Sequence, residues 1–278
     1  MISRRKLLVG AAGGAAVGAG AATAVGWHRV LRAVGISTGP DAHVVASGLD
    51  VIDATFDSAA MGGPVAWSRA VTVDRPEAVV LCLHGKGDDH RFAFDDIHLH
   101  DVAAAAAAPV AIVSVDGGED SYWHRRATGI DPQAMLFDEL VPLVTTTLGA
   151  TLPMYLVGWS MGGYGALLAA ETHPDLVAGV CATSPALFLH ASDVVPGAFD
   201  GPDDYTAHDV YAGVDRLPDD GARVRIDCGS EDPFFTADRR FADLLVDATT
   251  AWTDASHDAG YWRSVASAQL RTILDWMG

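Results

Sequence analysis

The most informative stretch of this sequence is Met154-Tyr155-Leu156-Val157-Gly158-Trp159-Ser160-Met161-Gly162-Gly163. Its first four residues form an apolar run typical of a buried strand, and the segment from Tyr164 to Ala170 after it is predicted to be helical. A Gly-x-Ser-x-Gly sequence between a strand and a helix places the serine on a sharp turn, the nucleophile elbow. Glycines two residues before and after the serine are needed because side chains there would clash. The pentapeptide alone occurs by chance in many proteins, but in this setting it predicts a nucleophile at Ser160.

The strand Met154 to Val157 has apolar counterparts upstream, at Ala78 to Leu83 and Val110 to Val115. None of the three alternates with polar residues, as expected for central parallel strands that are covered on both faces. Before them, Val51 to Phe56 and Val65 to Val73 are predicted to form an antiparallel hairpin that enters the same sheet.

Two helices are predicted between these strands. The first is the Ala-rich stretch from Asp101 to Ala108. The second runs from Asp131 to Leu148, with Asp131 as the N-cap and Pro132 at the first helical position. Strands that alternate with helices around a parallel core define the doubly wound α/β class.

The C-terminal half continues this pattern, with strands expected at Val177 to Ala182, Val224 to Cys228 and Ala248 to Thr253, and a closing helix at Ser264 to Trp276. The segment between the first two of these strands, Thr183 to Arg223, is rich in Pro, Asp and Gly and long for a simple connection. We expect it to be a cap-like insertion (183–223) with short helices, in which Phe188 and Tyr205 line a substrate pocket.

The N-terminus has the features of a targeting segment. Ser3-Arg4-Arg5-Lys6-Leu7-Leu8 precedes an Ala/Gly-rich apolar stretch and resembles a twin-arginine export signal. A weak membrane anchor is the alternative, although Ala and Gly give such a helix little transfer energy. We therefore predict a signal at 1–25, a linker at 26–45 and one domain at 46–278. The product would be secreted, periplasmic or associated with the cell envelope, with no stable membrane insertion after signal cleavage.

Composition narrows the class of protein. The chain has 278 residues, half of them hydrophobic, which suits one domain with a large core. Its formal net charge of −18 argues against nucleic acid or anionic membrane surfaces as partners, since both require clustered Lys and Arg. Three cysteines, Cys82, Cys181 and Cys228, fall in or at the ends of apolar runs and are predicted to be reduced core thiols.

Ser160 needs a base to take its proton and an acid to orient that base. In folds with this elbow the acid follows the serine along the chain and the histidine comes last. The loop after the predicted strand at 224–228 supplies Asp232 as the acid, with Glu231 as the alternative, whereas Asp227 is expected within the strand. His257 is the predicted base, because no other histidine follows Asp232.

An oxyanion hole is expected beside the serine. The turn after the strand Ala78 to Leu83 has the sequence His84-Gly85-Lys86-Gly87. In such folds this turn gives one backbone N–H and the residue after the nucleophile gives the other, here Lys86 and Met161. We expect His84 to support the loop, and the Lys86 side chain either to face solvent or to contact an anionic substrate group.

Metal and cofactor sites are not expected. His98-Leu99-His100-Asp101, together with His90, has only a faint likeness to a metallohydrolase motif, and these are predicted to be solvated loop histidines. Gly-rich phosphate loops of the Walker or dinucleotide type are missing from the sequence.

The chain resembles the esterase branch of the α/β-hydrolases, which contains esterase D (S-formylglutathione hydrolase), feruloyl esterases and the secreted mycolyltransferases. The resemblance extends from about Val79 to the C-terminus, and it rests on Leu83-His84-Gly85, Asp116-Gly117-Gly118 with Ser121-Tyr122-Trp123, Gly158-Trp159-Ser160-Met161-Gly162-Gly163, and His257-Asp258 with Tyr261-Trp262. It implies an α/β-hydrolase fold with a mostly parallel central sheet, helices on both faces and an insertion before the acid loop. It also implies cleavage of a small-molecule ester through an acyl-enzyme, without a cofactor.

Three functions remain open at this point. The leading hypothesis is an exported serine esterase. The alternatives are an acyltransferase that moves the acyl group to a sugar or other alcohol, and a non-catalytic hydrolase-fold binding protein. Non-catalytic relatives usually lose the serine or the histidine, whereas Ser160, Asp232 and His257 are all present here. Peptidase chemistry would use the same three groups. The acyl group, the alcohol and the oligomeric state are left unspecified.

Overall fold

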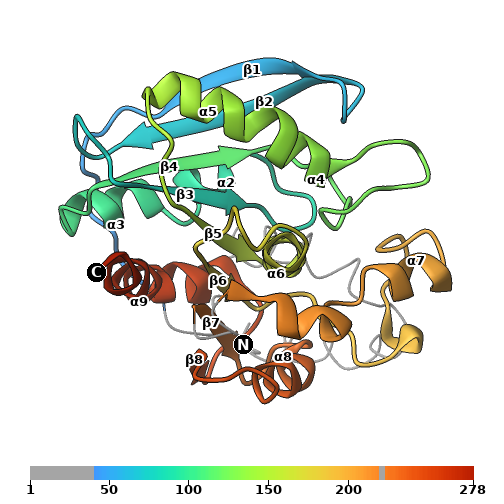
Figure 1. Cartoon of the computed structure of the whole chain (residues 1–278). Coiled ribbons are helices and arrows are strands. Elements are labelled where there is room, and N and C mark those ends of the chain that lie inside the picture. Colours follow the sequence, from blue (N-terminus) through green and yellow to red (C-terminus); the bar gives the residue numbers. More distant parts are fainter. Residues whose placement is uncertain (1–40, 219–222) are drawn as a thin grey trace, which may run out of the picture.

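A computed structural model describes residues 41–218 and 223–278 and contains an eight-stranded sheet in the order β1-β2-β4-β3-β5-β6-β7-β8 (Figure 1). The strands are β1 (Ile52–Ser58), β2 (Gly63–Val71), β3 (Ala78–Leu83), β4 (Val110–Val115), β5 (Met154–Trp159), β6 (Gly179–Thr183), β7 (Val224–Gly229) and β8 (Thr249–Thr253). The expected signal at 1–25 and most of the expected linker at 26–45 lie outside the described residues.

The sheet is parallel from β4 through β8, and only the N-terminal hairpin departs from this direction. Strands β1 and β2 pair antiparallel, with Ser58 opposite Gly63, and β2 pairs antiparallel with β4. All six residues of β3, β4 and β5 are buried, which explains why their sequences are almost entirely apolar, with Ser114 of β4 as a buried exception. The mostly parallel central sheet that the sequence predicts is therefore confirmed.

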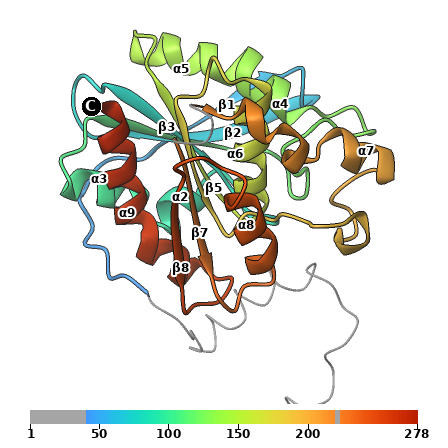
Figure 2. The ribbon, with the colours of Figure 1, turned by 60° about the horizontal axis from the view of Figure 1, so that its bottom comes forward.

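Helices cover both faces of the sheet (Figure 2). One face packs against α6 (Met161–Thr172), α8 (Phe235–Ala242) and the stretch formed by α4 (Pro132–Ala134), η3 (Met135–Leu140) and α5 (Val141–Leu148). The other face packs against α2 (Phe92–Asp95), α3 (Leu99–Ala105) and α9 (Ala259–Met277). Each face thus has its own apolar core, with the sheet between the two.

Several helix boundaries differ from the sequence expectations, and two of these differences have a clear local cause. The predicted helix from Asp131 is capped as expected, since the Asp131 carboxylate accepts from Ala134 N at 3.1 Å. It then widens into the π-helical segment η3, just before Pro142, whose missing N–H prevents the regular hydrogen-bond ladder from continuing. The C-terminal helix begins at Ala259 rather than Ser264, because the Asp258 side chain accepts from Tyr261 N at 3.0 Å and caps it.

The long connection between β6 and β7 leaves the sheet at its carboxyl end. It holds the short helices η4 (Ala191–Asp193), α7 (Pro202–Ala207) and η5 (Val210–Arg216), and η5 packs against α6. Because β3, β5, β6, β7 and β8 are parallel, the loops after them share this edge of the sheet, where ligands bind in open α/β folds.

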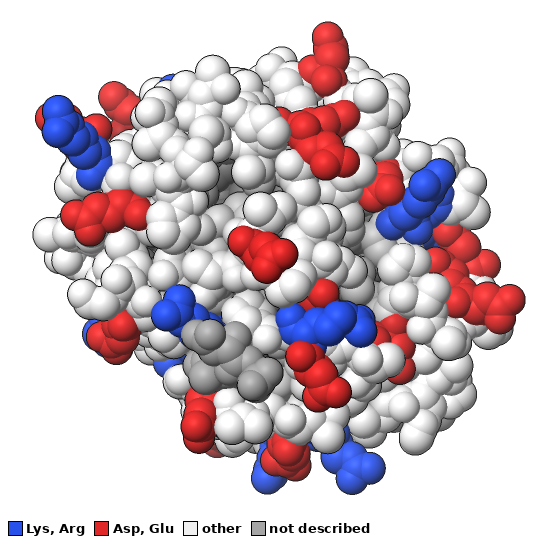
Figure 3. Space-filling model, viewed as in Figure 1, with Lys and Arg blue, Asp and Glu red and all other residues white. Residues whose placement is uncertain are grey.

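The described surface follows the acidic composition of the chain. On the face shown in Figure 3, Lys and Arg side chains stand singly beside Asp and Glu side chains. Within residues 41–218 and 223–278, every helix is too short or too polar to span a bilayer.

Candidate active site

Ser160 lies on the turn between β5 and α6, with a strained backbone. Its φ of 54° and ψ of −117° are rare for a residue with a side chain and cost on the order of 1–3 kcal/mol. Tight packing imposes this conformation. A Cβ at Gly162 would overlap the carbonyl oxygen of Leu83, and one at Gly158 would overlap the carbonyl oxygen of Gly162. The elbow therefore requires glycine at both positions, as the sequence predicts.

The Ser160 side chain belongs to a buried chain of hydrogen bonds. Its Oγ lies 2.9 Å from Nε2 of His257, and Nδ1 of His257 lies 2.7 Å from Oδ2 of Asp232. These residues follow β5, β8 and β7 respectively, and each is at most 5% exposed. The structure thus brings together the three residues that the sequence predicted as nucleophile, base and acid.

Asp232 is held as a carboxylate by its hydrogen-bond donors. Burial acts to raise its pKa, but the opposing effects are larger: the charge and hydrogen bond of His257, the Phe234 N–H at 2.9 Å from Oδ1, and the Ser184 hydroxyl. The net result is a lowered pKa, so that the side chain is ionised at neutral pH. An ionised partner fixes the His257 tautomer with its proton on Nδ1 and leaves Nε2 free to accept from Ser160.

The two alternative acids point elsewhere. Glu231 is exposed, and its Oε2 accepts from Ser256 Oγ at 3.1 Å. Asp227 lies within β7, as expected, where Arg225 binds both of its carboxylate oxygens at 2.9 and 2.6 Å.

Ser184 also hydrogen-bonds Asp232, a contact that the sequence did not predict. It follows β6 in a left-handed conformation, with φ of 47°, and its hydroxyl accepts from Nε1 of Trp262 at 3.1 Å while it hydrogen-bonds Asp232. The Trp262 ring lies edge-on to His257, with centroids 4.9 Å apart. In the sequence, Tyr261-Trp262 was noted only as part of the family resemblance. Its position four residues after His257 was the one feature that could have placed it near the site. Nothing in the sequence pairs it with Ser184.

Asp238 is a second buried carboxyl group behind the acid. It is fully buried in α8, and burial together with the charge of Asp232 raises its pKa well above the ordinary range. The neutral form of Asp238 is therefore favoured. Asp232 remains the charged partner of His257.

The turn after β3 lies directly against the serine. A Cβ at Gly85 would come within 3.6 Å of Cβ of Ser160, so the following N–H, of Lys86, borders the nucleophile. Among the described residues, the Lys86 N–H donates no hydrogen bond. Met161 is the first residue of α6, and an N–H at that position has no helical carbonyl to bind. Within residues 41–218 and 223–278, the N–H groups of both predicted oxyanion donors are therefore without a hydrogen-bond acceptor.

His84 supports this turn, as expected. Its Nε2 accepts from Gly117 N at 3.0 Å, and its Nδ1 lies 2.8 Å from the carbonyl oxygen of Gly85. Trp123, which is fully buried, donates from Nε1 to the His84 carbonyl at 3.2 Å. Tyr122 and Trp123 are consecutive residues with positive φ, of 51° and 55°, so this supporting loop is itself strained.

The Lys86 side chain is mostly buried and lies beside an acidic side chain. Its Nζ lies 3.8 Å from Oδ2 of Asp120, and the side chain is 20% exposed. A Cβ at Gly197 would lie 3.9 Å from this Nζ, so Lys86 reaches the insertion. The sequence left these contacts open because Asp120 and Gly197 belong to two other loops.

Aromatic rings connect the insertion to the predicted base. Phe234 contacts His257 at a centroid distance of 5.4 Å, and Phe188 contacts Phe234 at 5.7 Å. Phe188 is buried, and its carbonyl accepts from the Tyr205 hydroxyl at 2.9 Å. Phe188 is thus one ring away from the His257 contact, and Tyr205 lies behind it.

The histidines near α3 have a structural role. His98 Nδ1 and His100 Nε2 lie 3.4 and 3.6 Å from Oδ2 of Asp101, whose Oδ1 accepts from the N–H and hydroxyl of Ser47 at 2.6 and 2.7 Å. His100 is buried within α3 and is not the solvated loop residue that the sequence suggested.

Comparison with known proteins agrees with this geometry. Residues 64–269 match the family described as "Putative esterase". A pimeloyl-[acyl-carrier protein] methyl ester esterase of Neisseria meningitidis serogroup C is 31% identical over 129 residues, which are 46% of this chain and 45% of that protein. The chain therefore matches less than half the length of this curated relative.

Solved structures share the fold at low identity. A ferulic acid esterase superposes with a TM-score of 0.70 at 18% identity, over 82% of this chain and 99% of its own. The S-formylglutathione hydrolase of Agrobacterium tumefaciens gives 0.68 at 17% identity, over 86% and 100%. Mycobacterium tuberculosis MPT51 gives 0.69 at 18% identity, over 84% and 100%. The sheet, its flanking helices and the family match lead to one conclusion: the chain belongs to the putative esterase family and has the α/β-hydrolase fold.

Proposed function

We propose that the protein is a serine esterase in which Ser160, His257 and Asp232 form a catalytic triad. The observation that carries this proposal is the unbroken hydrogen-bond chain from Ser160 Oγ through both nitrogens of His257 to Asp232. In the first step, Ser160 Oγ attacks the ester carbonyl while its proton moves to Nε2 of His257. His257 then gives that proton to the departing alkoxide, which leaves as the alcohol, and an acyl-serine remains.

The second half of the cycle releases the acyl group. Water gives a proton to Nε2 of His257 as its oxygen attacks the acyl-serine, and collapse of the tetrahedral state returns the proton to Ser160 and frees the acid. In both halves, the N–H groups of Lys86 and Met161 would bind the carbonyl oxygen when it carries negative charge. Losing one such donor typically costs about 10² to 10³ in rate.

A labelling experiment tests this function. A fluorophosphonate probe should label the protein at Ser160, and p-nitrophenyl esters of increasing chain length should be turned over. An added sugar or other alcohol should leave the yield of free acid unchanged. Labelling with turnover only when the alcohol is present would identify an acyltransferase, and the absence of labelling would identify a binding protein.

We also propose export by the twin-arginine route, on the basis of Ser3-Arg4-Arg5-Lys6-Leu7-Leu8. Arg4→Lys with Arg5→Lys should trap the precursor in the cytoplasm, because the receptor requires the guanidinium pair and not positive charge alone. Fractionation followed by immunoblotting measures this. Unchanged export of the double variant would point to the general secretory route or a simple anchor.

A further inference from the structure

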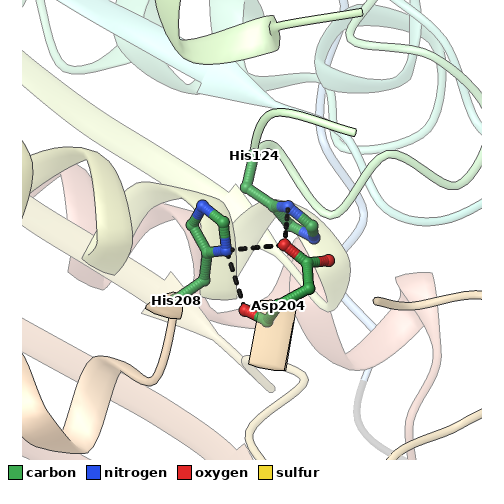
Figure 4. A group of neighbouring side chains, drawn as sticks. All are labelled: His124, Asp204 and His208. Atoms are coloured by element: carbon green, nitrogen blue, oxygen red, sulfur yellow. Dashed lines mark hydrogen bonds and ion pairs between the residues drawn. The ribbon is translucent and has the colours of Figure 1, made fainter. Parts of the chain in front are cut away.

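His124, Asp204 and His208 form a three-residue cluster where the insertion meets the sheet domain (Figure 4). His124 comes from the loop after β4, Asp204 lies in α7, and His208 follows α7 directly. One nitrogen or carboxylate oxygen from each residue lies within 4.8 Å of the other two. Among the described residues, no other three histidine, cysteine or acidic side chains bring their ligand atoms this close together.

The buried ring of His124 has an oxygen at each of its nitrogens. Nε2 lies 3.0 Å from the Ala198 carbonyl oxygen, and Nδ1 lies 2.9 Å from the Arg125 carbonyl oxygen. A neutral imidazole has one N–H, so it satisfies only one of these carbonyls and turns a lone pair towards the other. If the proton is on Nε2, the Nδ1 lone pair faces Arg125 O and, at 3.8 Å, Oδ1 of Asp204. A cation bound at Nδ1 would turn this repulsive arrangement into a favourable one.

The neighbouring groups supply the other ligands for such a cation. His208 Nδ1 lies 3.0 Å from Oδ1 of Asp204 and 2.9 Å from the Asp204 carbonyl oxygen. Ligands that are each about 2.0–2.2 Å from one ion are separated by roughly 3–3.5 Å. The His208 and Asp204 atoms already have this spacing, and His124, at 3.8 Å from Asp204 and within 4.8 Å of His208, would move closer to them on binding. The Nε2–H of His124 would donate to the Ala198 carbonyl, the outer contact that a metal-bound histidine usually makes.

We propose that His124, Asp204 and His208 bind a divalent transition-metal ion, with Zn²⁺ as the representative ion for a set of two imidazoles and one carboxylate. The ion enters from the surface, because the side chains of Asp204 and His208 are 19% and 25% exposed while that of His124 is fully buried. On binding, the His208 proton resides on Nε2, which leaves Nδ1 free to coordinate. This site departs from the sequence expectation of no metal.

The ion would fasten the insertion to the sheet domain. His124 stacks on Phe199 of the insertion at a centroid distance of 5.0 Å, and Phe199 in turn contacts Phe188 and Tyr122. The ligands are thus one ring away from the aromatic wall that reaches towards His257. The proposed role is structural and does not depend on the reaction at Ser160.

Zinc binding is tested on the untagged full chain, stripped with EDTA and dialysed into chelator-free buffer. Isothermal titration with ZnCl₂ should show one ion per chain, and mass spectrometry of the dialysed complex should find the same ratio of metal to protein. The melting temperature should rise with Zn²⁺ and level off once the site is filled.

Matched variants assign the ion to this cluster. Asp204→Asn and His208→Ala should each weaken binding by at least about 100-fold, since the loss of even an outer partner of a metal ligand costs about 10- to 100-fold. Exposed residues of the same two types in the insertion supply the controls, Asp203→Asn and His190→Ala, which should bind as the parent does. The two ligand variants replace partly exposed side chains, and circular dichroism verifies their folding. Substoichiometric uptake by the parent, or tight binding that survives in both Asp204→Asn and His208→Ala, would overturn the proposal.

Discussion

The elbow at Ser160 and the insertion between β6 and β7 both border the candidate active site, but different interactions hold them in place. Backbone contacts fix the elbow: Ser160 N donates to the Thr183 carbonyl at 3.0 Å, Ala186 N donates to the Ser160 carbonyl at 3.0 Å, and Gly162 lies against Leu83. These contacts involve no titratable group, so they are insensitive to pH and to ions.

The insertion depends instead on side chains, many of them charged. Arg126 donates to the Gly197 carbonyl at 2.9 Å and to both carboxylate oxygens of Asp200 at 3.0 and 3.3 Å. The buried carboxyl group of Glu171 in α6 lies 3.9 Å from Nη2 of Arg216 in η5, and its protonation depends on pH. The comparison shows that backbone contacts of the fold fix Ser160, whereas the insertion beside it is held by side-chain contacts that solution conditions can change.

The largest expected effect comes from removing the proposed nucleophile or the proposed base. Ser160→Ala and His257→Ala should each lower kcat by roughly 10⁶, as in a well-studied serine protease, and the double variant should be little worse than either. The two groups act as one unit, since a serine without its base keeps its proton. Ester turnover on the parent and three variants measures this, with the exposed His190→Ala as the control. Strictly additive losses would mean that the two residues do not act together.

Substitution of Asp232, the proposed acid, should lower kcat less than substitution of Ser160 or His257. Asp232→Asn keeps the shape of the site but no longer fixes the His257 tautomer, so kcat should fall by about 10⁴ with little change in KM. Glu231→Gln, one residue away and exposed, is the matched control and should retain activity. The reverse result, with activity lost only in Glu231→Gln, would move the acid by one residue.

The attachment of the insertion should depend on pH through Glu171. Burial raises the pKa of Glu171 to about 9, Arg216 opposes this shift and Asp209 adds to it. The carboxylate oxygens have no hydrogen-bond partner among the described residues, and Nη2 of Arg216 is 3.9 Å away. The neutral acid is therefore the form that the folded state favours.

The sign follows from linkage. Below pH 4.5 both states are protonated and there is no penalty. Between there and pH 9 the unfolded chain ionises while the folded chain does not, so the free energy of unfolding falls as pH rises. Glu171→Gln has no carboxyl group to ionise and so avoids this loss. Its free energy of unfolding, relative to that of the parent, should therefore increase by about 1 kcal/mol for each unit that the pH rises. Urea unfolding at pH 5.5 and pH 8 measures it, with the exposed Glu77→Gln as control. A constant difference between the two pH values would contradict the assignment.

The smallest expected effect concerns selectivity. Phe188→Leu reduces one ring of the wall without leaving a large cavity, so the ratio of kcat/KM between long and short p-nitrophenyl esters should change by about tenfold. Fluorophosphonate labelling of Ser160 should be unchanged. Leu244→Ala, at an exposed position, is the control and should keep the parent ratio. An unaltered ratio in Phe188→Leu would remove Phe188 from the pocket.

The elements nearest the elbow were predictable because their sequences carry strong local constraints. Strongly apolar runs without polar alternation identified β3, β4 and β5, and the glycines around Ser160 identified the turn. The candidates Asp232 and His257 followed from chain order along parallel strands, since loops after such strands share one edge of the sheet.

Contacts between loops far apart in the sequence could not be predicted. The pairing of Ser184 with Trp262 spans 78 residues, and that of His124 with Ala198 spans 74. The first depends on how α9 packs against the end of β6, and the second on how the insertion folds back over the sheet; no periodicity or spacing encodes either. The π-helical turn of η3 was missed for a similar reason, because the apolar positions around it also fit an ordinary helix.

Cys82, Cys181 and Cys228 are free, fully buried and located in β3, β6 and β7. Burial raises the pKa of each thiol, so the reactive thiolate is scarce in the native state. A thiol reagent such as a maleimide can reach them only after the central strands separate. The rate at which these cysteines are labelled therefore reports how often the sheet opens. The measurement needs no engineered probe and does not depend on Ser160.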